Sequence, residues 1–318
     1  MTLPPVRRTL ALRGLVMDIV ELHNRSVGAF AQLVQSVRNE QWSAPTPCAE
    51  WDVRALVNHV VGEERWTVPL MAGRTIADVG TAFDGDLLGD DPARTALIAA
   101  ADAQLAAGTD VRTVHLSYGD ESTDEYLRQL VADHLIHTWD LAAAVGADRS
   151  LDAELVAEVT LWFAERAELY RSAGMVGDPL PSSADPADAL LAAFGRDPSW
   201  SPALDLVNRF GAAFDRCDLD AVLALVTPGC VFESTSPAPD GQRFEGADAV
   251  RAEWRKLFEN TVEPRFETEE TIVAGDRAVV RWHYSWRAET GGRGHVRGVD
   301  VMRLRDGKIA EKLSYVKG

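Results

Sequence analysis

Residues 133–142 read Asp-His-Leu-Ile-His-Thr-Trp-Asp-Leu-Ala, and this stretch decides the fold of the first half of the chain. Asp133, His137 and Leu141 recur at intervals of four residues, so they share one face of a helix that the pattern predicts over residues 122–145. A carboxylate and an imidazole therefore lie one turn apart on an apolar stripe. Because burying an unpaired carboxylate is costly, Asp133 is expected to have a partner.

A second predicted helix, over residues 51–69, supplies that partner. His59 lies at the edge of its apolar stripe, and with Asp133 and His137 it would offer two imidazole nitrogens and one carboxylate to a divalent cation. Such a set leaves coordination positions open for water or a substrate sulfur. Zn²⁺ is the expected ion, with Ni²⁺ and Mn²⁺ as alternatives. The competing interpretation is that these histidines are ordinary core or surface residues.

Three neighbouring side chains leave alternatives open. His134 is a rival ligand, because its spacing from His137 also permits both to bind one ion. Asp140, one turn after His137, either orients that ligand or is a solvated helix acid. Cys48 lies beside prolines before the second helix and, with no cation near it in the sequence, is expected to be a packed thiol rather than a reactive one.

The first half of the chain is helical throughout. Helical periodicity with no convincing strand between its segments predicts an all-α, up-and-down bundle. The segments are residues 15–37, 51–69, 92–107, 122–145 and 151–172. Glycine and proline accumulate over residues 174–202, which marks a boundary between two domains. We expect a bundle domain at 1–195, a linker at 196–202 and a second domain at 203–318.

The second domain begins with helices and ends with strands. Helical periodicity covers residues 203–214 and 246–258. Period-two strands follow at residues 266–273, 277–288, 295–305 and 308–316. Helices first and hairpin-connected strands last predict an α+β cone with a curved antiparallel sheet.

One face of these strands is expected to line a small-molecule pocket. Alternation puts Trp282, Tyr284 and Tyr315 on that face. Asp300 shares the face with apolar neighbours and is the candidate catalytic residue, because desolvation would raise the affinity of its carboxylate for a proton. The alternatives are that Asp300 pairs with a nearby arginine, or that a one-residue slip of register reverses the faces.

Charge and composition narrow the partners. The chain of 318 residues has a formal net charge of −17, and residues 1–200 hold 30 acidic against 15 basic side chains. Such a surface repels phosphate backbones and anionic lipid heads, so the expected partner is a small molecule, not nucleic acid or a membrane. The three cysteines have no Cys-x-x-Cys spacing, and no signal peptide or membrane-spanning run is expected. The expected location is the cytoplasm.

Two stretches of the first half resemble a known family. Residues 45–59, PTPCAEWDVRALVNH, and residues 133–142 resemble the signature helices of the DinB-like, mycothiol-dependent maleylpyruvate isomerase-like bundles. The resemblance implies that His59, Asp133 and His137 are metal ligands, with Asp133 standing where the family usually has glutamate. It also implies a low-molecular-weight thiol such as mycothiol, whose sulfur the metal activates.

The second half resembles another family. Residues 204–318 are similar to the SnoaL-like, nuclear-transport-factor-like superfamily, most clearly at 298–309, GVDVMRLRDGKI, and at 314–317, SYVK. The resemblance implies the cone fold and a homodimer. Members include isomerases, epoxide hydrolases, polyketide cyclases and ligand-binding proteins, so the fold selects no reaction.

Together these features favour a metal-dependent enzyme that acts on a small molecule by thiol transfer or thiol-dependent isomerisation, with the second domain holding the substrate. The first alternative is a cofactor-free isomerase, cyclase or hydrolase centred on Asp300, with a structural bundle. The second alternative is a protein that binds a small ligand without turnover.

Overall fold

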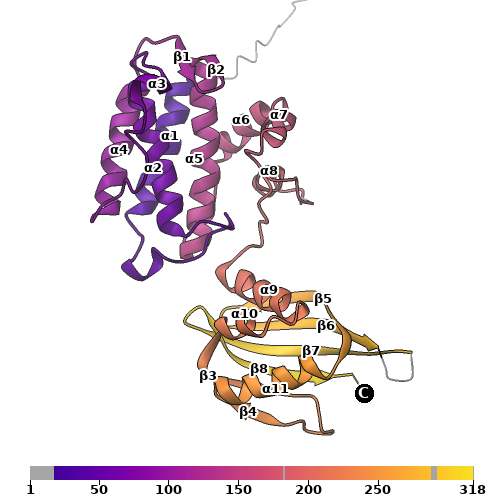
Figure 1. Ribbon diagram of the computed structural model, residues 1–318. Helices are drawn as coiled ribbons and strands as arrows, with labels where there is room; N and C mark the ends of the chain where they lie inside the picture. Colours follow the sequence, from indigo (N-terminus) through magenta and orange to yellow (C-terminus); the bar gives the residue numbers. More distant parts are fainter. Residues whose placement is uncertain (1–17, 182, 288–291, 318) are drawn as a thin grey trace, which may run out of the picture. The chain divides into compact units, whose positions relative to one another are not determined.

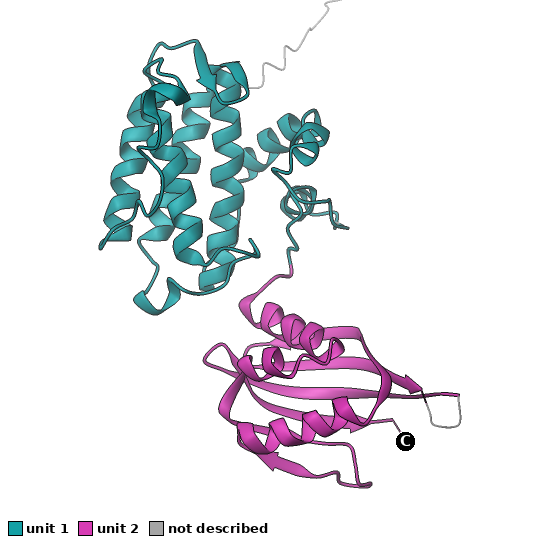
Figure 2. Cartoon of the chain, viewed as in Figure 1, with its two compact units in different colours: residues 1–198 teal, residues 199–318 magenta. Residues whose placement is uncertain are grey.

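The structure is a computed structural model that describes residues 18–181, 183–287 and 292–317. The chain forms two compact units, residues 1–198 and 199–318 (Figure 2). Among the described residues, no helix combines the length and the apolar composition that crossing a membrane requires.

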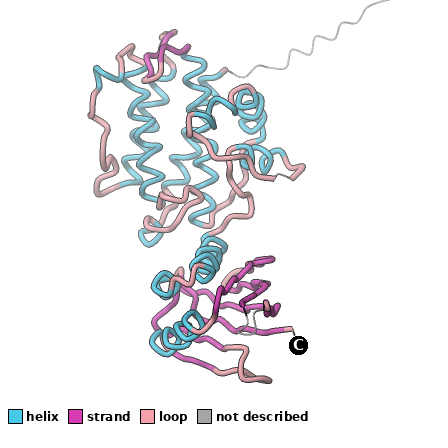
Figure 3. Tube along the Cα trace, turned by 45° about the vertical axis from the view of Figure 1, so that its right-hand side comes forward, coloured by secondary structure: helices cyan, strands magenta, loops and turns pink. Residues whose placement is uncertain are grey.

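Unit 1 is built on long helices that lie side by side (Figures 1 and 3). Helices α1 and α2 each pack on both α4 and α5. These helices are α1 (Ile19–Val34), α2 (Val53–Leu70), α4 (Pro92–Ala107) and α5 (Thr123–Val145). Shorter helices complete the unit: η1 (Asn39–Gln41), α3 (Ile76–Val79), α6 (Ala153–Ala164), α7 (Ala167–Ser172) and α8 (Pro186–Ala193). The expected helical bundle is confirmed.

Local signals fix the ends of the two helices that carry the candidate metal ligands. Asp52 caps α2 by accepting a hydrogen bond from the backbone N–H of Ala55 at 2.8 Å. Ser122 caps α5 by accepting one from Glu125 at 3.2 Å. Gly146 ends α5 with φ at 72°, a left-handed conformation that glycine adopts without strain.

Two details of unit 1 differ from the expectation. Strands β1 (Thr113–Leu116) and β2 (Gly119–Ser122) form an antiparallel hairpin before α5, where no strand was expected. The helix expected over 151–172 is divided into α6 and α7 by a break next to Arg166. The first residues of the helix expected from residue 15 lie outside the described residues.

Unit 2 is a curved sheet with helices packed on it (Figure 1). The strand order is β4-β3-β8-β7-β6-β5, in which β3 runs parallel to β8 and the other neighbouring pairs are antiparallel. Its elements are α9 (Pro202–Asp215), α10 (Leu219–Ala224), β3 (Val226–Glu233), β4 (Arg243–Glu245), α11 (Ala247–Glu259), β5 (Val262–Ala274), β6 (Arg277–Arg287), β7 (Arg293–Arg305) and β8 (Lys308–Val316). The expected α+β fold is confirmed, and β3 and β4 add to the expected strands.

The core of unit 2 lies between α9, α11 and the sheet. Phe210 and Phe214 of α9 contact Trp254 of α11, with ring centroids 5.8 and 5.7 Å apart. Val280 and Met302 of the sheet belong to the same buried cluster. These side chains do not fill the interior completely, and all five border a cavity.

Candidate metal centre and ligand pocket

The first site lies between α2 and α5 of unit 1. His59 comes from α2, and Asp133 and His137 come from α5, one turn apart. Asp133 Oδ1 lies 3.4 Å from His59 Nε2 and 3.3 Å from His137 Nε2, and ligand atoms of all three residues lie within 4.8 Å of one another. We call these residues the three-ligand cluster. Its two nitrogens and one carboxylate suit a divalent cation.

Burial and charge set the protonation of the cluster. Burial acts to raise the pKa of Asp133, but His137 and His59 outweigh burial and hold that pKa well below its usual range. Burial acts to lower the pKa of His137, yet Asp133 and Asp140 hold it well above its usual range. Asp133 Oδ2 is buried without a hydrogen-bond partner among the described residues. An anionic oxygen that lacks a donor fits a bound cation, so the residues present suit a metal ion.

Asp140 holds the ring of His137. His137 Nδ1 donates to Asp140 Oδ2 at 2.9 Å, which leaves Nε2 directed at the rest of the cluster. Asp140 was expected either to orient His137 or to be solvated, and its exposed fraction of 0% agrees with the first alternative.

A second set of potential ligands overlaps the first. Cys48, His137 and Asp140 also bring ligand atoms within 4.8 Å of one another. Arg196 donates to Cys48 Sγ at 3.2 Å and to Asp140 Oδ2 at 3.0 Å, so a cation already lies on this side of His137. A metal ion there would meet the guanidinium, which favours the three-ligand cluster instead.

His134 lies on a different side of α5 from the cluster. Its Nδ1 donates to the backbone carbonyl of Leu130 at 2.7 Å, and its Nε2 lies 3.5 Å from Glu64 Oε1 in the core. The ring also packs edge-on against His23 and Phe30. His134 is therefore a core residue in this structure, not a fourth member of the cluster.

Two neighbours of the cluster were not singled out from the sequence. The ring of Trp51 lies 4.8 Å from that of His59 and 5.8 Å from that of His137, and forms one wall of the site. Glu63 lies one turn after His59 on α2, and burial, together with the charge of Asp133, raises the pKa of its carboxyl. The four-residue spacing from His59 is the signal that could have found Glu63.

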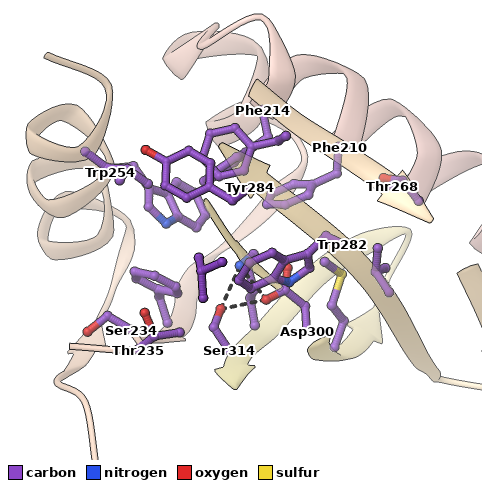
Figure 4. A pocket seen from close by; sticks show the side chains of 18 of the residues that line it. Phe210, Phe214, Ser234, Thr235, Trp254, Thr268, Trp282, Tyr284, Asp300 and Ser314 are labelled. Atoms are coloured by element: carbon purple, nitrogen blue, oxygen red, sulfur yellow. Dashed lines mark hydrogen bonds and ion pairs between the residues drawn. The ribbon is translucent and has the colours of Figure 1, made fainter. Parts of the chain in front are cut away.

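The second site is a cavity of about 340 Å³ in unit 2 (Figure 4). Trp282 and Tyr284 of β6 line it, as expected, and so does Asp300 of β7. Further aromatic rings from α9, α11 and the sheet make its wall largely apolar. The residues that carry them are Phe210, Phe214, Phe232, Trp254, Phe266 and Trp286.

A buried ion pair lies in the wall of this cavity. Lys312 Nζ is 2.8 Å from Asp300 Oδ1, and Ser314 Oγ donates to the same oxygen at 2.6 Å. The ammonium also lies 5.5 Å from the ring centre of Phe214 and 5.2 Å from that of Phe232. The sequence left an arginine partner for Asp300 open, and the structure has a lysine.

Tyr315 does not line the cavity, contrary to the expectation. Its side chain is 51% exposed, because β8 carries one extra residue, Ala310, where its register against β7 shifts. Beyond this bulge the inward face passes to Lys312 and Ser314. Simple alternation counted from Ile309 therefore assigns the wrong face to the end of β8.

Two indole N–H groups in the wall lack a partner. Trp254 Nε1 and Trp282 Nε1 are buried with no acceptor among the described residues. An indole N–H can only donate, so these two donors are unsatisfied by the described residues, and both nitrogens are covered by protein atoms.

Family models match both halves of the chain. Residues 24–142 match the mycothiol maleylpyruvate isomerase N-terminal domain, and residues 207–312 match the SnoaL-like domain. Both resemblances seen in the sequence are confirmed, and together they support a small-molecule enzyme or binding protein.

Individual relatives cover one unit or the other. "Uncharacterized protein Rv0738" of Mycobacterium tuberculosis (strain ATCC 25618 / H37Rv) is 33% identical over 195 residues, which cover 57% of this chain and 98% of the relative. An NTF2-like protein of unknown function from Mesorhizobium loti is 41% identical, with 37% of this chain and 92% of that chain covered and a TM-score of 0.33. An NTF2-like protein of unknown function from Burkholderia pseudomallei K96243 is 26% identical, with 37% and 92% covered and a TM-score of 0.34. By the two family-model matches, the chain belongs to the mycothiol maleylpyruvate isomerase N-terminal domain family through its first unit and carries a SnoaL-like domain in its second.

Proposed function

We propose that this protein is a metal-dependent enzyme in which His59, Asp133 and His137 hold a divalent cation that serves thiol transfer or thiol-dependent isomerisation of a small molecule. The observation that carries the proposal is the convergence of these three side chains within 4.8 Å, with one Asp133 oxygen lacking a donor among the described residues. Zn²⁺ is the favoured ion, with Ni²⁺ and Mn²⁺ as alternatives, and the thiol is a low-molecular-weight one such as mycothiol.

The residues around the cluster have distinct tasks. When bound, the ion supplies a lowered pKa to a coordinated thiol or water. Asp140 fixes the His137 ring by accepting its Nδ1–H, and Trp51 packs on both histidine rings and excludes water from that side. His59 and Asp133, with side chains 29% and 28% exposed, leave the cluster open to an approaching thiol.

The cavity of unit 2 is the proposed site for the substrate. The Lys312–Asp300 pair is neutral as a whole, so a charged ligand would bring an uncompensated charge against an apolar wall. The rest of the lining is largely aromatic, so a flat ring would pack well against it. These features favour an uncharged ring compound.

Metal content tests the proposal. Wild type and His59→Ala/His137→Ala are stripped of metal, dialysed against zinc, nickel or manganese, gel-filtered and measured by plasma mass spectrometry. We expect about one ion per chain in wild type and none in the variant. The matched control, His115→Ala/His283→Ala, removes two histidines outside the cluster and is expected to keep the ion. Wild type without any ion would overturn the proposal.

Thiol binding is tested separately on the metal-loaded protein. Mycothiol is compared by calorimetry with its S-methyl derivative, which keeps the scaffold but loses the ionisable sulfur. We expect the free thiol to bind more tightly and to release a proton, because a coordinated thiol is deprotonated. Equal binding of both compounds without proton release would mean that the sulfur does not reach the ion.

Asp300 carries a second candidate function, a cofactor-free isomerase, cyclase or hydrolase. The observation that favours it is a carboxylate only 6% exposed that lines the cavity. This function predicts activity that survives chelation and His59→Ala/His137→Ala but disappears in Asp300→Asn. The opposite pattern would support the metal enzyme.

A further inference from the structure

Arg196 forms a fork on a buried carboxylate. Its Nε lies 3.0 Å from Asp140 Oδ1 and its Nη2 lies 3.0 Å from Asp140 Oδ2. Asp140 is fully buried, and Arg196 approaches it from the segment after α8, 56 residues further along the chain. A planar guanidinium that bonds both oxygens fixes the orientation of the carboxylate as well as its charge.

The end of α8 aims Arg196 at this carboxylate. Gly195 follows α8 with φ at 75°, and a Cβ there would lie 3.1 Å from the carbonyl oxygen of Asp178 and from Gly177 Cα. The backbone N–H of Arg196 then donates to the carbonyl of Leu191 at 2.8 Å, which closes the turn. A glycine at position 195 therefore allows the tight turn that brings Arg196 back to the bundle.

The same carboxylate holds a ligand of the three-ligand cluster. Asp140 Oδ2 accepts both from Arg196 Nη2 and from His137 Nδ1, at 3.0 and 2.9 Å. Cys48 Sγ lies 3.3 Å from that oxygen and 3.2 Å from Arg196 Nη2, and so fills the remaining side. If the fork were removed, the carboxylate could rotate, and the His137 ring would lose the acceptor that sets its orientation.

We propose that Arg196 is a positioning residue for the metal ligand His137 and acts through Asp140. The inference rests on the proposed metal site and adds a residue to it, because Arg196 lies beyond residues 24–142, the segment that the family model matches. The competing explanation is that the fork only fastens the end of α8 to the bundle. The two differ in whether the coordination of the metal changes when the fork is weakened.

Cobalt binding to the full chain distinguishes these explanations. Arg196→Lys keeps a positive charge but loses the two-pronged geometry. We expect its Kd for Co²⁺ to rise about 10- to 100-fold and its visible absorption spectrum to change. The matched control is Arg166→Lys, since Arg166 makes the same kind of fork with Glu125 of α5, at 2.6 and 2.9 Å, away from the cluster. That variant is expected to bind Co²⁺ as wild type does.

Chemical rescue separates positioning from folding. Arg196→Ala is expected to bind Co²⁺ weakly, and added guanidinium at non-denaturing concentration is expected to restore the wild-type spectrum. If Arg196→Ala does not fold, Arg196→Lys still decides. If Arg196→Lys keeps the wild-type Co²⁺ affinity and spectrum, or if Arg166→Lys loses as much Co²⁺ affinity as Arg196→Lys, the role of Arg196 is overturned but the metal site is not. A wild type that binds no Co²⁺ would instead overturn the proposed metal site on which it rests.

Discussion

Lys312 Nζ lies 2.8 Å from Asp300 Oδ1, and the two residues are only 7% and 6% exposed. We predict that Lys312→Met lowers the free energy of unfolding of unit 2 by about 3–5 kcal/mol, because it leaves a buried carboxylate without its counter-charge. Urea unfolding followed by tryptophan fluorescence measures the loss. In the double variant Asp300→Leu/Lys312→Met both charges are gone, so most of the stability is expected to return. A double variant less stable than Lys312→Met would contradict this account.

Gly298 leaves room for an aromatic ring of the cavity wall. A Cβ at this position would lie 2.4 Å from Cζ2 of Trp282 and 2.3 Å from the carbonyl oxygen of Tyr315. We predict that Gly298→Ala displaces the Trp282 indole and destabilises unit 2 by about 1–3 kcal/mol. Near-ultraviolet circular dichroism and urea unfolding report the two effects. Gly229→Ala is the control, because no atom of the described residues lies within 4 Å of a Cβ at that position, and an equal loss there would refute the steric explanation.

Regular periodicity is the part of this fold that the sequence predicted well. Helix α4 and strand β8 have the bounds expected from the pattern, Pro92–Ala107 and Lys308–Val316. The spacing of Asp133 and His137 was likewise sufficient to put both on one face of α5, where their side chains lie 3.3 Å apart. Metal binding by these residues stays a prediction, since spacing and proximity leave it untested.

The sequence pattern did not predict contacts between distant segments or irregularities within strands. Arg196 meets Asp140 across 56 residues, and no periodic pattern relates the two positions. The bulge at Ala310 cannot be seen in the alternation of apolar and polar residues along the sequence of β8, although it turns Tyr315 outward and Lys312 inward. Both features arise from three-dimensional packing, which a one-dimensional pattern does not record.

His23 is expected to make unit 1 sensitive to acid. It is fully buried, and burial together with neighbouring His134, itself 3.5 Å from Glu64, lowers its pKa from 6.5 to about 3. Between pH 6.5 and about 3, His23 thus stays neutral in the folded protein but takes up a proton in the unfolded chain. The contribution of His23 to the free energy of unfolding is therefore complete above pH 6.5 and is lost as the pH falls toward 3. The free energy of unfolding should fall by up to about 1.4 kcal/mol per pH unit in this window.

The substitution His23→Leu checks this assignment. Urea unfolding is followed by far-ultraviolet circular dichroism at several pH values. Because His23→Leu removes the titrating group, its urea midpoint should decline less than that of wild type between pH 6.5 and about pH 5. His115→Gln, in the β1–β2 hairpin, serves as the control and should keep the wild-type slope. Parallel slopes in wild type and His23→Leu would assign the acid sensitivity to other groups.

Asp133 lies 3.3 Å from Nε2 of His137, whereas Cys48 lies 3.3 Å from the Asp140 oxygen that accepts from Nδ1, and this difference separates the two sets of potential ligands. Asp133→Asn keeps the shape of the side chain but removes the anionic ligand, so we predict that the ion is lost on gel filtration. Cys48→Ser is predicted to keep the ion, because Arg196 already supplies a cation on that side. Metal per chain, measured by plasma mass spectrometry for both variants and wild type, gives the answer. If Cys48→Ser loses the ion while Asp133→Asn keeps it, the metal lies on the Asp140 side of His137 and the proposed ligand set is wrong.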